Sequence, residues 1–145
     1  MNFVEHRKDR ERNLAKACDL WEDVRTKIEE CCNSFNQHYR VIGDVECVPV
    51  NGHSIKITVT FTGGTNPPPV GVIYPKRTVR ITFSETKPSI HVTVDANPVR
   101  AFLIDADDSH CFILQGASEI DIEKFAALAL EDAFFNVPPG RPQAS

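Results

Sequence analysis

Apolar side chains recur at intervals of three and four residues near the start of the chain. The residues that share this spacing are Leu14, Ala17, Trp21, Val24, Ile28, Cys31 and Phe35. Charged residues fill most positions between them, which predicts an amphipathic α-helix with one narrow apolar seam. The charged residues upstream are compatible with a start as early as about Phe3. A helix over 3–37 is about 50 Å long, whereas typical strands span roughly 17–20 Å. We therefore expect part of this helix to extend beyond any sheet on which it packs, or the helix to break.

From Tyr39 onward the period changes from helical to two. The apolar positions that alternate in this way are Ile55, Ile57, Val59, Phe61, Val79, Ile81, Phe83, Ile90, Val92 and Val94. Threonine and charged residues occupy the positions between them, which predicts an antiparallel sheet with one solvated face. Asn51-Gly52 predicts a hairpin turn between two of the strands. Two later runs, 101–104 and 111–114, are apolar on both faces, so we expect the sheet to be covered more completely there.

A second helix is predicted over 122–135. Asp121 is its expected N-cap, and its inner stripe is Ile122, Phe125, Ala126, Ala129 and Ala133. The remaining residues of this segment are also mostly apolar. The final stretch, 137–145, contains three prolines and is predicted to be disordered.

These elements predict an α+β fold. A long N-terminal helix precedes an antiparallel sheet of five or six strands, a short C-terminal helix follows, and both helices lie on one face of the sheet. The expected organisation is a charged helical extension over 1–13, a single α+β domain over 14–136, and the disordered tail over 137–145.

Charge is distributed unevenly along the chain, whose net charge is −4. Residues 1–94 carry thirteen basic and eleven acidic groups, whereas residues 95–135 carry two basic and nine acidic groups. The one dense basic cluster, within 7–16, is interrupted by Asp9 and Glu11, which is typical of a solvated helix surface with local ion pairs. We therefore expect no nucleic-acid partner. No apolar run approaches the roughly 18 residues of a membrane span, and no apolar leader begins the sequence, so we expect no membrane association and a cytoplasmic protein.

The five cysteines predict reduced thiols rather than a disulfide framework. They are odd in number, have no Cys-x-x-Cys spacing and occur in apolar patterns. Neighbouring Cys31 and Cys32 point about 100° apart on a helix, which is unfavourable for a dithiol site. The segment 105–110 is similar to the start of a calcium loop, but its sixth and twelfth positions are His110 and Gly116 rather than glycine and glutamate. We expect no metal and no cofactor.

The connection over 63–77 has two interpretations. It begins with Gly63-Gly64, continues with three prolines at 67–69, and ends in an apolar stretch over 70–74. A flexible start, a rigid arm and an apolar tip are compatible with a flap over a groove. The favoured interpretation is a short edge strand over 70–74 that ends at Pro75.

Lys56, Arg80 and His91 lie among threonines on the solvated side of the predicted sheet. If their strands adjoin, they share one face and are candidates for binding an anion. Exposed antiparallel sheets are commonly rich in threonine with scattered charges. An ordinary solvated surface is therefore the favoured interpretation.

Three functions remain open. The first is a small non-enzymatic protein-interaction module, most simply a homodimer. Two apolar helix surfaces and one apolar sheet face are more than we expect one chain to bury, and the exposed remainder marks an interface. The second is a small-ligand domain with an apolar pocket between Trp21, Ile28 and the sheet, under a lid that includes Tyr74. The third is an enzyme with His91 or His110 as general base, which lacks an evident nucleophile or metal. No catalytic residue is assigned.

Overall fold

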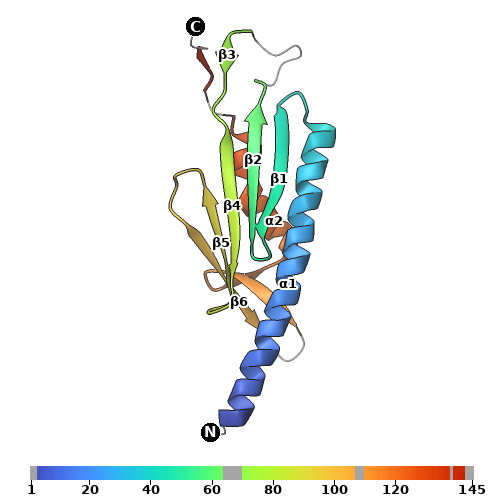
Figure 1. The fold of residues 1–145 in the computed structure, drawn as a ribbon, viewed down its shortest axis with the longest axis vertical. Helices are drawn as coiled ribbons and strands as arrows, with labels where there is room; N and C mark the ends of the chain where they lie inside the picture. The colour runs from blue at the N-terminus through green and yellow to red at the C-terminus, as the bar shows by residue number, and fades with distance from the viewer. Residues whose placement is uncertain (1–2, 64–69, 107–109, 138, 143–145) are drawn as a thin grey trace.

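A computed structural model describes residues 3–63, 70–106, 110–137 and 139–142, with side chains described from residue 11 onward. Its helices and strands follow one another along the chain (Figure 1). In order they are α1 (Phe3–His38), β1 (Gly43–Asn51), β2 (Ser54–Phe61), β3 (Val72–Ile73), β4 (Arg77–Ser84), β5 (Ser89–Val94), β6 (Arg100–Ala106), β7 (Cys111–Gln115), β8 (Ser118–Ile120), α2 (Ile122–Phe135) and β9 (Arg141–Pro142).

Seven of the strands form one antiparallel sheet in the order β1-β2-β4-β5-β6-β7-β8. The α+β class is confirmed, with one strand more than expected, because β8 has only three residues and shows no alternation that a sequence pattern could reveal. Both helices cover the same face of the sheet. The buried residues of that face are Val45, Ile55, Ile57, Val59, Phe61, Val79, Ile81, Phe83, Ile90, Val92, Val94, Phe102, Ile104, Ile113 and Ile120.

Helix α1 is continuous over 36 residues and extends past the sheet at its N-terminal end (Figure 1). The predicted extension of the helix beyond the sheet is thus confirmed. The seam is buried as expected from Ala17 to Phe35, except that Cys32 is buried and Cys31 is half-buried. An α-helix rotates by 100° per residue, so neighbouring positions at the margin of a seam are hard to tell apart from spacing alone.

Two polar contacts fix α1 against the edge strand β1. Near one end of β1, the Trp21 indole N–H donates to the carbonyl oxygen of Gly52 over 2.9 Å. Near the other end, the Asn36 side chain donates to the Val45 carbonyl oxygen and accepts from the Val45 N–H, both over 2.8 Å. Helix α1 and strand β1 therefore run antiparallel, since Trp21 contacts the C-terminal end of β1 and Asn36 contacts its N-terminal end.

Helix α2 begins and ends where the sequence predicts. The Asp121 carboxylate caps it by accepting a hydrogen bond from the Lys124 N–H over 2.6 Å. Leu130 and Phe134 are buried together with most of the expected stripe, while Ile122 is half-buried. The helix therefore satisfies much of its apolar surface within the chain.

An arginine on β4 holds the C-terminal end of α2. Arg77 Nη2 lies 2.8 Å from Asp132 Oδ2, and Arg77 Nε lies 2.9 Å from Asp95 Oδ2. The same guanidinium donates to the Asp132 carbonyl oxygen over 2.9 Å. Hydrogen bonds from Asn136 and Arg77 lower the pKa of the Asp132 carboxyl.

The expectation that the sheet is covered more completely over 101–104 and 111–114 is wrong. Leu103 pairs directly with Leu114 on the face away from the helices, and Leu103 is 40% exposed. Both helices pack on the opposite face, so the outward side chains of β6 meet no helix. An apolar run on both faces of a strand therefore marks an uncovered apolar surface here.

The apolar part of the 63–77 connection is a short strand, but not at the edge of the main sheet. Strand β3 pairs with β9 in a separate two-stranded sheet, using Arg141 and Pro142 from the stretch expected to be disordered. Gly63, at the start of the connection, has φ 90°, and a β-carbon there would lie 2.7 Å from the Tyr74 hydroxyl. Residues 64–69 lie outside the described part of the chain, so the flap interpretation is not tested there.

Candidate functional site: the groove between the two helices

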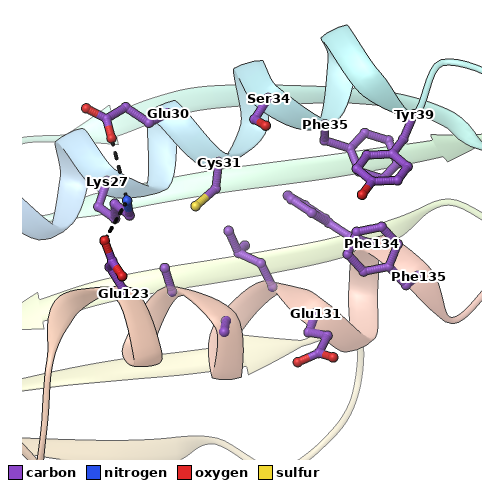
Figure 2. A pocket seen from close by; sticks show the side chains of 13 residues that line it. Lys27, Glu30, Cys31, Ser34, Phe35, Tyr39, Glu123, Glu131, Phe134 and Phe135 are labelled. Carbon is purple, nitrogen blue, oxygen red and sulfur yellow. Dashed lines mark ion pairs between the residues drawn. The ribbon is translucent and has the colours of Figure 1, made fainter.

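A groove of about 480 Å³ opens between α1 and α2, on the side of the helices away from the sheet (Figure 2). We call it the α1–α2 groove. Its floor is made of small or aliphatic side chains, namely Cys31, Ala126, Ala127 and Leu130. Small residues on α2 leave room between the helices that longer side chains would fill. The floor is therefore apolar and open to solvent.

Aromatic rings close one end of the α1–α2 groove. Phe35 and Phe134 are buried, and their ring centroids lie 4.9 Å apart. Tyr39 and Phe135 meet edge to face at 5.1 Å, yet they remain 42% and 49% exposed. Two large rings that stay half in water offer an apolar contact surface to an occupant of the groove.

The walls of the groove are acidic. They carry the carboxylates of Glu30, Glu123 and Glu131 and a single ammonium group, Lys27. Lys27 Nζ lies 3.8 Å from Glu30 and 3.6 Å from Glu123, so it bridges the two helices (Figure 2). Glu131 has no ion pair or hydrogen bond with another described residue. An apolar floor with acidic walls is complementary to a partner that is both apolar and cationic.

Comparison of the chain with protein-family models, with curated proteins and with solved structures gives no match.

The residues of the expected ligand pocket lie far apart. Trp21 and Ile28 are 2% and 0% exposed, within the core between α1 and the sheet. Trp21 contacts Gly52 before the start of β2, whereas Tyr74 lies against Gly63 after its end. Eight residues of strand, about 26 Å, separate these two places. The described part of the connection therefore does not lie over Trp21.

The three residues considered for anion binding do share the open face of the sheet. Lys56 lies directly opposite Arg80, and His91 lies opposite Thr82 in the next row. Neither Lys56 nor Arg80 forms an ion pair with another described residue. Two like charges directly opposite each other are unfavourable in a sheet unless water or an anion screens them.

The two candidate histidines have different partners. The Ser89 hydroxyl donates its one proton to the Lys87 carbonyl oxygen over 2.8 Å, so His91 Nε2, 3.0 Å away, donates to Ser89 rather than accepting from it. His110 lies 3.4 Å from Glu119, and both are exposed. Among the described residues no group of three or more His, Cys, Asp or Glu side chains is placed to bind a metal. No helix within the described ranges combines the length and the apolar character needed to cross a bilayer.

The α1–α2 groove was not predicted from the sequence. Its residues come from two helices about a hundred positions apart in the chain, and only their relative placement creates the groove. One signal was available, because the surplus of apolar residues on α2 predicted that part of its apolar surface stays exposed. Phe135 is the exposed member of that surplus.

Proposed function

We propose that this protein is a non-enzymatic interaction module that acts as a homodimer. In the proposed dimer, the first turns of α1 in each copy occupy the α1–α2 groove of the other copy. We call these turns, residues 3–13, the α1 overhang. The observation that carries the proposal is the groove itself, with its acidic walls, apolar floor and exposed rings.

Charge complementarity favours the α1 overhang as the occupant. Its sequence, FVEHRKDRERN, contains four arginines and lysines against three acidic residues. The groove has three carboxylates against one ammonium group. A second groove from another copy would instead bring two acidic surfaces together, which opposes a groove-to-groove contact.

The order of residues also fits. When a two-fold axis lies perpendicular to two identical helices that pack side by side, the helices run antiparallel. The apolar start of the overhang, Phe3-Val4, then reaches the aromatic end of the groove, and Arg7-Lys8 reaches the level of Glu30 and Glu131. The overhang is about 16 Å long and the groove, from residue 27 to residue 39, about 18 Å.

The overhang of a given copy has no access to its own groove. Helix α1 is unbroken from Phe3 to His38, and the groove begins at Lys27 of the same helix. The overhang therefore points away from it (Figure 1). Packing stabilises a helical segment far more than intrinsic propensity does, and in the proposed dimer the groove of the second copy packs against the overhang.

Sedimentation velocity of the full chain and of a variant lacking residues 1–10 tests the proposal. At tens of micromolar, a concentration on the order of weak interface affinities, we expect twice the 16.2 kDa chain mass for the full chain. The shortened variant keeps the buried seam from Ala17 to Phe35, and we expect a folded monomer. A monomeric full chain, or a shortened variant that still dimerises, would contradict the proposal. A monomer that binds a small organic cation in the groove would favour a ligand site there, at a different place from the predicted pocket between α1 and the sheet.

A further inference from the structure

Two cysteines from different elements face each other where α1 packs on β1. Cys32 is buried on α1, and Cys47 is half-buried on β1, on the side of the sheet that the helices cover. Both thiols are free. The sequence gives little warning of this pairing, because fifteen positions and a change of secondary structure separate the two residues.

The two tethers between α1 and β1 fix the register that brings these cysteines together. From Trp21 to Asn36 the helix rises about 22 Å, and from Val45 to Gly52 the strand spans about 23 Å. The helix and the strand therefore cover nearly the same length between the two contacts. Cys32 lies one helical turn before Asn36 (about 6 Å), and Cys47 lies two strand residues after Val45 (about 7 Å). The register thus places Cys32 opposite Cys47.

The contact between the thiols is polar as well as steric. The interaction between the two side chains raises the pKa of Cys32 and lowers the pKa of Cys47. Burial raises the pKa of both groups. Among nearby charges, Glu29 raises the pKa of Cys47 and Arg25 lowers it. The Arg25 Nε atom is buried without a hydrogen-bond partner in the described residues, so this guanidinium has an unused donor on the buried side.

We propose that Cys32 and Cys47 form an oxidation site, at which a hydroperoxide converts the two thiols into a disulfide that joins α1 to β1. Cys47 is the attacking thiol, because it is the more accessible of the two. Cys32 is the resolving thiol, because it is buried against Cys47. The site is separate from the α1–α2 groove and goes beyond the proposed dimer.

The reaction has two steps. The Cys47 thiolate attacks a peroxide oxygen, the O–O bond breaks, and the leaving oxygen takes up a proton, which leaves Cys47 as a sulfenic acid. Cys32 then loses its proton and attacks the Cys47 sulfur, the S–O bond breaks, and hydroxide leaves with that proton as water. Two thiols lose two electrons and two protons in total, and the peroxide is reduced to an alcohol and water. A second pair of thiols, such as a small dithiol, reverses the reaction by exchange.

Mass spectrometry of the full chain after treatment with hydrogen peroxide tests the proposal. We expect a loss of about 2 Da, the two thiol hydrogens, that dithiothreitol reverses. Trypsin cleaves after Lys27, Arg40 and Lys56, so the peptides 28–40 and 41–56 are expected to be linked. Cys31 shares the first peptide, and fragmentation between positions 31 and 32 assigns the bond. A link to Cys31, or no link between these peptides, would overturn the proposal.

Matched cysteine variants give an independent readout. Cys31→Ser, Cys18→Ser and Cys111→Ser are expected to retain the loss of 2 Da, whereas Cys47→Ser and Cys32→Ala are expected to abolish it. In Cys32→Ala the sulfenic acid has no resolving thiol, so a reagent that captures sulfenic acids is expected to label Cys47. Labelling of another cysteine, or persistence of the loss in either variant of the pair, would contradict the assignment. The peptide map of the wild-type chain tests the proposal even where a variant fails to fold.

Discussion

The side-chain amide of Asn36 and the backbone of Val45 form a reciprocal pair of hydrogen bonds, each 2.8 Å long. This pair satisfies the N–H and the carbonyl of an edge-strand residue with one side chain. It also sets where along β1 the helix α1 lies, and therefore which residues of the two elements meet.

Replacing Asn36 with alanine removes both hydrogen bonds and leaves two backbone groups of β1 without these partners. We expect Asn36→Ala to lower the free energy of unfolding by about 1–3 kcal/mol. Urea denaturation measures the change. Asn33→Ala, at an exposed position of the same helix, is the control and is expected to change stability by less than about 0.5 kcal/mol. Equal effects of the two substitutions would show that the contact with Val45 does not hold α1 in place.

The Arg77–Asp132 ion pair predicts a dependence of stability on pH. The pKa of Asp132 is lower in the folded chain than in the unfolded chain, so its contribution to stability is present at neutral pH and is lost as the pH falls through the folded pKa. We expect Asp132→Asn to destabilise the protein at pH 7 by about 0.5–1 kcal/mol. The effect is small because Asp132 is largely exposed, and solvent screens its ion pair.

Denaturation at several pH values measures this difference. The gap between wild type and Asp132→Asn is expected to close in acid below the ordinary aspartate range, while Asp23→Asn, at an exposed position on α1, changes little at any pH. A gap that stays constant down to acidic pH would mean that the ion pair adds nothing to the stability of the fold.

Two neighbouring residues of β6 test which face of the sheet is covered. Ile104 is 9% exposed beneath the helices, whereas Leu103 is 40% exposed on the open face. We expect Ile104→Ala to cost about 2–4 kcal/mol and Leu103→Thr to change stability by less than about 0.5 kcal/mol. Leu103→Thr is also expected to leave the dimer intact. A monomeric Leu103→Thr variant in sedimentation velocity would place the dimer contact on the open sheet face instead of the groove.

The sequence predicted most of the local structure. The bounds of α2 follow from an N-cap at Asp121 and a helical apolar period, both of which act within a few residues of the chain. The alternation over 55–61 and 79–94 reports directly on the covered face of the sheet, because side chains of a strand point alternately to its two faces. These signals are local, and a single sequence contains them.

Apart from the short strand β8 and the exchange of Cys31 for Cys32 in the seam, the missed features depend on contacts between distant segments. The pairing of β3 with β9 joins positions seventy residues apart and leaves no local pattern in either segment. The apolar runs at 101–104 and 111–114 indicated strands correctly, but not that one face would remain uncovered. The α1–α2 groove and the pairing of Cys32 with Cys47 arise only from the placement of α1 on the rest of the fold.

A charge exchange between the α1 overhang and the α1–α2 groove tests the proposed dimer most directly. We expect Glu123→Lys with Glu131→Lys to give a monomer, because the walls then repel the overhang of the partner. Asp44→Lys with Glu46→Lys, the same charge change at exposed positions of β1, is expected to leave a dimer. Arg7→Glu with Lys8→Glu is expected to give a monomer as well.

The decisive measurement is the molecular mass, by sedimentation velocity, of the chain that carries the groove and overhang substitutions together. Each copy then has a basic groove and an acidic overhang, so the groove and the overhang again carry opposite charges and attract each other. We predict that this fourfold variant recovers twice the 16.2 kDa chain mass. A fourfold variant that stays monomeric while the β1 control remains dimeric would contradict the pairing of overhang and groove.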